Sequence, residues 1–275
     1  MNHRHATRLC TLLAALLFAL PSPPARAEST VRIGGTGSGT GGMRLLARAF
    51  MSTRPDVTVD VQAAVGSSGG IGAVIDGRLD LAVSNREPNE KEKTVSPLVT
   101  VEYARTPFVV ALRKGLEVRA LTSDQLAGLY APGATTFPNG KRARPVLRLS
   151  DAGDTKLLQS FSPAVASAVE AASIRPGMLN ANTDSETADM LEKTPGAFAV
   201  STLALIESEA RPLTALDIDG KHPSVANLAN GSYPYFKSLF LVVGPGAGPN
   251  ARAFADFVRS EEGRKLLTSH GHWVR

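Results

Sequence analysis

The chain is poor in cysteine, with Cys10 alone among 275 residues. That cysteine lies in residues 1–27, which have the features of a secretory signal: a basic start with Arg4 and Arg8, an apolar run too short to span a bilayer, and a small-x-small pattern ending at Ala27. We therefore expect residues 1–27 to be a cleaved signal peptide. An exported chain without cysteine forms no disulfide and no thiolate metal site, so its stability has to come from a buried core.

The rest of the chain also lacks an excess of charge of either sign and lacks long apolar runs. Three of the 30 lysines and arginines lie in residues 1–27, which leaves 27 basic residues against 25 acidic ones. A nearly neutral protein argues against nucleic acid as a partner. No stretch after residue 27 has the length and apolar character of a transmembrane helix, and the chain is long enough for one large or two modest α/β domains.

Two glycine-rich stretches are present, each between a predicted strand and a predicted helix. The first, 34–42, follows a short apolar strand and precedes an amphipathic helix. The second, 66–70, follows the alternating strand 57–62 and precedes a short helix over 71–76. A helix N-terminus leaves backbone N–H groups unpaired and positively polarised, and glycine lets a ligand approach them. Both stretches are predicted to be anion-binding loops, the first with hydroxyl donors from Thr36, Ser38 and Thr40.

Two further polar groups follow predicted strands. Residues 84–87 end an apolar strand over 79–83, and ligands of open α/β sheets bind at the carboxyl ends of strands. The second group begins at Arg148, whose planar, permanently charged guanidinium suits a tetrahedral oxyanion. The alternative is an ordinary surface arginine paired with Asp151 or Asp154.

The remaining pattern predicts an alternation of strands and helices. In chain order, it predicts a strand over 107–112 that crosses between lobes, a helix capped by Thr122 or Ser123, a helix over 184–193, a turn and apolar strand within 195–203, a return strand over 240–243, and a helix pair or one broken helix over 251–269 around Gly263.

Taken together, these motifs resemble the phosphate-type periplasmic solute-binding proteins of ABC transporters. The resemblance runs in order over nearly all of the mature chain. It is carried by the two glycine stretches, the arginine group, and four later runs, 195–200, 219–221, 231–234 and 260–263. It implies an α/β, two-lobed, type II periplasmic-binding-protein-like fold that closes on a dehydrated oxyanion without catalysis.

The resemblance also implies which residues hold the anion. Ser38 with the backbone of Gly39 falls on the first loop of the family, Ser67 on the second, and Arg148 on the arginine. The neighbouring hydroxyls of Thr40 and Ser68 are assigned to the same ligand site. Asn85 stands where phosphate-specific members have an aspartate, and Ala152 with Asp154 stand where they have a serine and a threonine. An aspartate accepts the proton of hydrogen phosphate, so Asn85 is expected to relax selectivity, and Asp154 is expected to offset the charge of Arg148.

The expected organisation is a signal peptide over 1–27, a first lobe built from 28–109 and 238–275, and a second lobe over 110–237. Hinges are expected near 107–112 and 233–241. The expected partners are a phosphate-like anion and an ABC transporter permease in the inner membrane, for a monomeric periplasmic protein with no cofactor and no metal site.

Other interpretations of the same motifs stay open. A binding protein of the same fold for a different solute is one. A secreted serine hydrolase is another, because 66–70 fits the G-x-S-x-G pattern with Ser68 as nucleophile and His222, His270 or His272 as base. The G-x-G-x-x-G pattern at 37–42 formally suggests a dinucleotide site, but no ribose-reading acidic residue follows at the required place.

Overall fold

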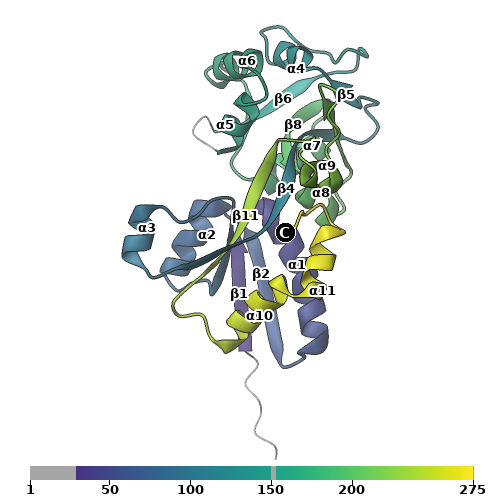
Figure 1. Cartoon of the computed structure of the whole chain (residues 1–275). Coiled ribbons are helices and arrows are strands. Elements are labelled where there is room, and N and C mark those ends of the chain that lie inside the picture. The colour runs from purple at the N-terminus through teal and green to yellow at the C-terminus, as the bar shows by residue number, and fades with distance from the viewer. Residues whose placement is uncertain (1–28, 150–152, 275) are drawn as a thin grey trace, which may run out of the picture.

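The computed structural model describes residues 29–149 and 153–274 and shows an α/β protein of two lobes, the first below and the second above in Figure 1. This confirms the predicted two-lobed fold. The strands are β1 (Ser29–Gly35), β2 (Val57–Ala64), β3 (Leu81–Ser84), β4 (Val99–Arg113), β5 (Ala120–Leu121), β6 (Arg144–Arg148), β7 (Leu179–Ala181), β8 (Ala197–Thr202), β9 (Leu213–Ala215), β10 (Asp217–Ile218) and β11 (Phe236–Val243). The helices are α1 (Gly37–Thr53), α2 (Gly66–Ile75), α3 (Glu90–Val95), α4 (Ser123–Leu129), α5 (Gly153–Gln159), α6 (Pro163–Ser173), α7 (Asp184–Lys193), α8 (Leu203–Ser208), α9 (Val225–Ala229), α10 (Pro249–Arg259) and α11 (Glu261–Thr268).

Two antiparallel strands, β4 and β11, run between the lobes (Figure 1). Within the described residues the sheet order is β2-β1-β3-β11-β4-β8-β6-β7, with β9 also paired to β4. The part of β4 up to Pro107 pairs with β11, and the part from Phe108 onward pairs with β8 of the second lobe. The predicted crossing strand over 107–112 therefore lies within β4, and the predicted return strand over 240–243 lies within β11.

Each lobe has an apolar core of its own. In the first lobe, side chains of α1, β1, β3 and α10 pack together, with the rings of Phe50 and Phe254 edge to face at 5.4 Å between centroids. In the second lobe, Tyr130 and Phe198 make the same kind of contact, also at 5.4 Å. Because β1 and β3 are parallel, their carboxyl ends meet at one edge of the sheet, where α1 and α2 begin.

The two glycine-rich stretches do not form loops, so the predicted loop conformation is wrong. In the first, α1 already begins at Gly37, and in the second α2 begins at Gly66. The glycines are needed for close packing. A Cβ built on Gly39 would lie 2.7 Å from Cγ1 of Val83. Glycine in these first helical turns therefore lets α1 lie directly against the sheet, and the helix N-termini remain the feature of interest.

Local signals predicted several other elements well. The N-cap of α4 is Thr122, whose hydroxyl accepts a hydrogen bond from the amide of Gln125 at 3.1 Å, and α7 spans the predicted residues 184–193. The C-terminal helices break at Ser260 and not at the predicted Gly263, because the Ser260 hydroxyl caps α11 by accepting from the Gly263 amide at 3.1 Å.

Some predictions fall outside the described residues, namely the signal peptide over 1–27 and the roles of Asp151 and Ala152. Among the residues that are described, no helix combines the length and apolar character needed to cross a membrane.

Candidate functional site

The site is built around the N-terminus of α1, which has no cap of its own. Thr36 occupies the N-cap position but makes no side-chain capping bond, and the first turn carries no acidic residue. Ser38 and Thr40 in that turn are buried. A helix start leaves N–H groups that need an acceptor from elsewhere. Here the amide of Ser38 donates to Oδ2 of Asp184, at 3.3 Å.

The Asp184 carboxylate has four potential donors from three elements: α1 with its N-cap residue, β6 and β11. Its Oδ2 accepts from the hydroxyl of Thr36 at 2.9 Å as well as from the Ser38 amide. Its Oδ1 lies 2.9 Å from Nζ of Lys237 on β11 and 3.4 Å from Nη1 of Arg148 at the end of β6. Asp184 is itself the first residue of α7 and its side chain is only 7% exposed. One oxyanion is therefore held by a helix N-terminus, a hydroxyl, an ammonium and a guanidinium.

A second carboxylate completes the group of charges. Oδ1 of Asp154, in the first turn of α5, lies 2.6 Å from Nζ of Lys237, and its Oδ2 lies 3.4 Å from Nη1 of Arg148. Asp154 thus points at the arginine that it was expected to offset. We call Arg148, Asp154, Asp184 and Lys237 the charge cluster; its two cations face two carboxylates at the junction of the lobes.

One donor of the charge cluster is left over. Nη2 of Arg148 donates to the carbonyl oxygen of Asn182 at 2.9 Å. The Nε of Arg148 is buried and has no hydrogen-bond partner within residues 29–149 and 153–274. A buried unpaired donor is costly, so it marks a place where a ligand acceptor would be stabilised.

The ionisation of the cluster follows from its charges. Burial would raise the pKa of the Asp184 carboxyl, but Lys237 and Arg148 outweigh burial and hold that pKa below its usual range. Burial would lower the pKa of Lys237, but the two carboxylates outweigh burial and raise it. Burial, with the negative charge of Asp184, raises the pKa of Asp154, and Lys237 offsets only part of this. Asp184 is therefore the most firmly ionised carboxylate of the cluster.

Asn85 connects the two glycine-rich stretches. Its backbone N–H donates to the hydroxyl of Ser67 at 2.9 Å, and its side-chain Oδ1 lies 2.6 Å from the hydroxyl of Thr36. Its Nδ2 donates to the carbonyl oxygen of Ser238 on β11 at 3.4 Å. The Thr36 hydroxyl has one proton and two acceptors, Asn85 and Asp184, so it can donate to only one of them at a time.

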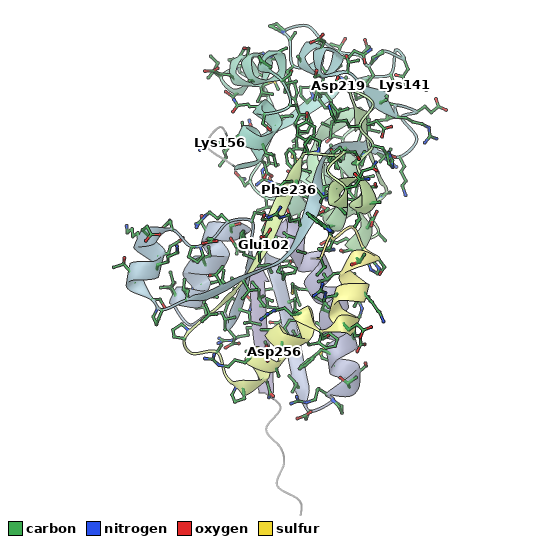
Figure 2. All side chains as sticks on the ribbon, viewed as in Figure 1. Glu102, Lys141, Lys156, Asp219, Phe236 and Asp256 are labelled. Atoms are coloured by element: carbon green, nitrogen blue, oxygen red, sulfur yellow. The ribbon has the colours of Figure 1, made fainter. Side chains whose placement is uncertain are left out.

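A cleft of about 620 Å³ lies beside the charge cluster. It is lined by Asn85 from the first lobe, by Asp154 and Lys156 from the second, and by Phe236 and Lys237 from β11. Figure 2 shows Lys156 on the second lobe and Phe236 on the strand that passes between the lobes. A small solute in this cleft would therefore meet two members of the charge cluster, Asp154 and Lys237.

The structure therefore brings together some of the predicted site residues and separates others. Ser38, Arg148 and Asp154 meet at the charge cluster, and Asn85 reaches it through Thr36. The other four have partners elsewhere. In α1, the amide of Gly39 donates to the carbonyl oxygen of Thr36 at 3.1 Å, and the Thr40 hydroxyl lies 3.5 Å from the Gly37 carbonyl oxygen. In α2, the Ser67 hydroxyl accepts from the Asn85 amide, and the Ser68 hydroxyl accepts from Arg86 at 2.9 Å.

The contacts of Ser68 also bear on the hydrolase alternative. The hydroxyl of Ser68 has Arg86 as its partner, and the three candidate histidines are bonded elsewhere. The Nδ1 atoms lie 2.8 Å from Oδ1 of Asp217 for His222, 2.8 Å from the Leu266 carbonyl oxygen for His270, and 2.8 Å from the His270 carbonyl oxygen for His272. His270 also lies 3.1 Å from the hydroxyl of its neighbour Ser269, and none of these contacts aligns a base with Ser68, the predicted nucleophile.

Two central residues, Lys237 and Asp184, were not among the predicted site residues. Lys237 is a lone charge within the apolar run of β11, a pattern in which a charge is either a surface residue or a buried partner of another charge. Asp184 follows the N-cap Thr183, where an acidic residue is common for purely local reasons. The lone charge of Lys237 can be recognised in the sequence. An acidic residue at the position of Asp184 has a local explanation, so its role becomes clear only in the fold.

Comparison with known proteins agrees with this architecture. A family model described as a PBP superfamily domain matches residues 21–262. The phosphate-binding protein PstS of Bacillus subtilis is 24% identical over 229 residues, which are 82% of this chain and 74% of that protein. A putative phosphate ABC transporter substrate-binding protein with bound phosphate, from Clostridium perfringens, has a TM-score of 0.72 at 21% identity and is matched over 90% of this chain and 100% of its own.

A third relative extends the comparison. An ABC-type phosphate transport receptor from Vibrio cholerae has a TM-score of 0.57 at 21% identity, with 90% of this chain and 100% of that chain covered. At such identities the structural likeness establishes the fold. The family model, which covers most of the residues, establishes more: the chain belongs to the PBP superfamily, that of the periplasmic binding proteins.

Proposed function

We propose that this protein is an exported solute-binding protein that captures a small oxyanion, phosphate first, and delivers it to an ABC transporter permease in the inner membrane. One observation carries the proposal. Four donors, from the start of α1, from β6 and from β11, surround a single carboxylate at the N-terminus of α1, which is the arrangement that an oxyanion requires. The relatives described as phosphate-binding support phosphate as the first candidate.

In the proposed mechanism the solute binds between the lobes and stabilises the closed form. The first lobe contributes the amide of Ser38 and the hydroxyl of Thr36, the second lobe contributes Arg148, and β11 contributes Lys237. A ligand that bridges both lobes shifts the equilibrium toward closure by its differential affinity for the closed state. We propose hinges near 107–112 and 233–241, where β4 and β11 pass from one lobe to the other.

The organisation proposed for the whole chain follows the same division. Residues 1–27 form a cleaved signal peptide, the first lobe comprises 28–109 and 238–275, and the second comprises 110–237. The protein acts as a periplasmic monomer and is not an enzyme, since the family binds and releases its ligand without altering it.

A thermal-shift screen of the purified protein tests the proposal. Phosphate, arsenate, sulfate, phosphonates and small organic solutes are each added at saturating concentration. A ligand present at 100 times its dissociation constant adds about 2.7 kcal/mol to the free energy of unfolding, so phosphate should raise the melting temperature by several degrees. A rise with an organic solute and none with any oxyanion would contradict the proposal and favour a binding protein of the same fold for a different solute.

A further inference from the structure

The N-terminus of α1 is capped by the opposite lobe. Thr36 provides no capping bond, whereas Asp184, which begins α7 in the second lobe, accepts from both the Thr36 hydroxyl and the Ser38 amide. The two helix starts are in close contact. A Cβ built on Gly37 would lie 2.7 Å from Oγ of Ser185 and 3.0 Å from Cβ of Asp184.

This contact brings four positive groups onto Asp184, two of which, Lys237 and Arg148, also face Asp154. The N-termini of α1 and α7 both carry partial positive charge, and Lys237 and Arg148 add two full charges. Without an anion between them, these groups would repel one another as the lobes approach. Asp184 supplies that anion from within the chain.

We propose that the Asp184 carboxylate is an internal competitor for the oxyanion site: it occupies the donors meant for the solute, helps to hold the lobes together alongside contacts such as the Arg44–Glu209 ion pair, and so sets the affinity of the site. Asp154 does not share this role, because its contacts are with Lys237 and Arg148 and it has none with α1 among those that the described residues make. The affinity part of the inference rests on the proposed function. The closure part stands without it.

Binding then becomes an exchange of one anion for another. An external oxyanion reaches the Ser38 amide and Nζ of Lys237 only when Asp184 withdraws, and withdrawal separates α7 from α1. The apparent affinity is therefore reduced by the fraction of molecules in which Asp184 is engaged. Such a site binds only a ligand whose interactions with these donors are more favourable than those of the Asp184 carboxylate.

The test compares Asp184→Asn with Asp154→Asn, which removes the same charge from the same cluster. The mature protein, residues 28–275, is measured without phosphate by small-angle X-ray scattering and with phosphate by calorimetry. Asp184→Asn should increase the radius of gyration of the phosphate-free protein and tighten phosphate binding about tenfold or more. Asp154→Asn should keep the wild-type radius, since its change leaves the contact with α1 intact.

A second variant separates closure from charge. Gly37→Ala places a methyl group against Ser185 and Asp184 without altering any charge, so it should also open the phosphate-free protein. It serves as the test of closure if Asp184→Asn does not fold, which circular dichroism would reveal.

The radius of gyration and the phosphate affinity of these variants decide whether Asp184 competes with the solute. A phosphate-free Asp184→Asn protein with the wild-type radius would overturn the inference, as would weaker phosphate binding than in the wild type, which would make Asp184 part of the ligand site. If Asp184→Asn cannot be measured, a closed Gly37→Ala protein would overturn it. Opening of the variants combined with no phosphate binding by any protein would uphold the closure part and contradict the proposed function.

Discussion

At the scale of single residues, the ammonium of Lys237 is the centre of the charge cluster. Its side chain is 5% exposed, lies within 2.9 Å of two carboxylates, and sits 5.6 Å from the centroid of the Phe108 ring. A buried ion pair contributes little net stability compared with an apolar pair, but removal of one partner leaves an uncompensated buried charge. The cluster is therefore sensitive to loss of this one side chain.

We predict that Lys237→Met lowers the free energy of unfolding by about 3 to 5 kcal/mol, because two buried carboxylates are left with Arg148 alone. Urea denaturation measures this. The matched control is Lys265→Met, since Lys265 is 76% exposed and its pairing with Glu261 at 2.7 Å is of the surface kind, for which we expect less than about 1 kcal/mol. Equal losses in the two variants would show that the cluster is not the buried network described here.

Asn85 is the residue at which solute selectivity is expected to be decided. Replacement by aspartate restores an acceptor for the proton of hydrogen phosphate and disfavours sulfate, which has no proton to donate. We predict that Asn85→Asp increases the phosphate to sulfate affinity ratio by about tenfold, in line with about 1 to 3 kcal/mol for an unmatched buried polar group. Asn180→Asp, at an exposed position, makes the same chemical change and should leave the ratio unaltered in competition calorimetry. An unchanged ratio in Asn85→Asp would contradict the assigned role.

His272 gives the protein a distinct acid sensitivity. It is fully buried beside α1, and burial lowers its pKa to about 4 from an ordinary 6.5. Below pH 6.5 this histidine is protonated in the unfolded chain, whereas in the folded protein it stays neutral down to about pH 4. Acid therefore favours unfolding between these two pH values. We predict that stability falls by about 3 kcal/mol between pH 6.5 and 4 from this residue. In His272→Asn that part of the pH dependence, followed by denaturation at each pH, should disappear; its persistence would assign the effect to other groups.

At the scale of elements, the glycines at the helix starts are the clearest difference between sequence and structure. The local sequence pattern predicted part of β4, part of β11 and the whole of α7, because such signals involve neighbouring residues only. A glycine run has no such unique meaning, since it suits a flexible loop and a tightly packed helix start equally well. Only tertiary packing, such as Gly39 against Val83, distinguishes the two.

Two glycine to alanine variants, one at a tightly packed helix start and one at an open helical position, test whether the first glycine-rich stretch is packed as described. Gly39→Ala would place its methyl 2.7 Å from Val83 and 2.9 Å from the hydroxyl oxygen of Tyr103, so we predict a loss of about 1 to 3 kcal/mol from overpacking. Gly72→Ala in α2 meets no atom within 4 Å, so the better helix propensity of alanine should raise stability by about 0.5 to 1 kcal/mol. Thermal unfolding of both variants gives the comparison, and stabilisation by Gly39→Ala would mean that this stretch is a loop after all.

At the scale of the whole molecule, the site depends on contacts between residues far apart in sequence. The motif resemblance predicted the two lobes, Arg148 at the site between them and a carboxylate, that of Asp154, which offsets the charge of Arg148. It did not predict that Asp184 would cap a helix that begins more than a hundred residues earlier, because neither segment contains a sequence pattern that identifies the other as its partner. Lys237 stands out as a lone charge in its apolar strand, but its two carboxylate partners lie in other segments of the chain. The contacts of these two residues follow from the way the lobes meet and not from any single motif.

The central claim is that the donors around Asp184 form the binding site of a small oxyanion, and calorimetric titration of phosphate into the wild type and Arg148→Ala tests it most directly. We predict saturable binding by the wild type and a loss of about 2 to 5 kcal/mol of binding free energy in Arg148→Ala, because truncation removes a charge-assisted contact in a desolvated cleft. Phosphate binding of equal strength in the two proteins, or none by the wild type, would contradict the account.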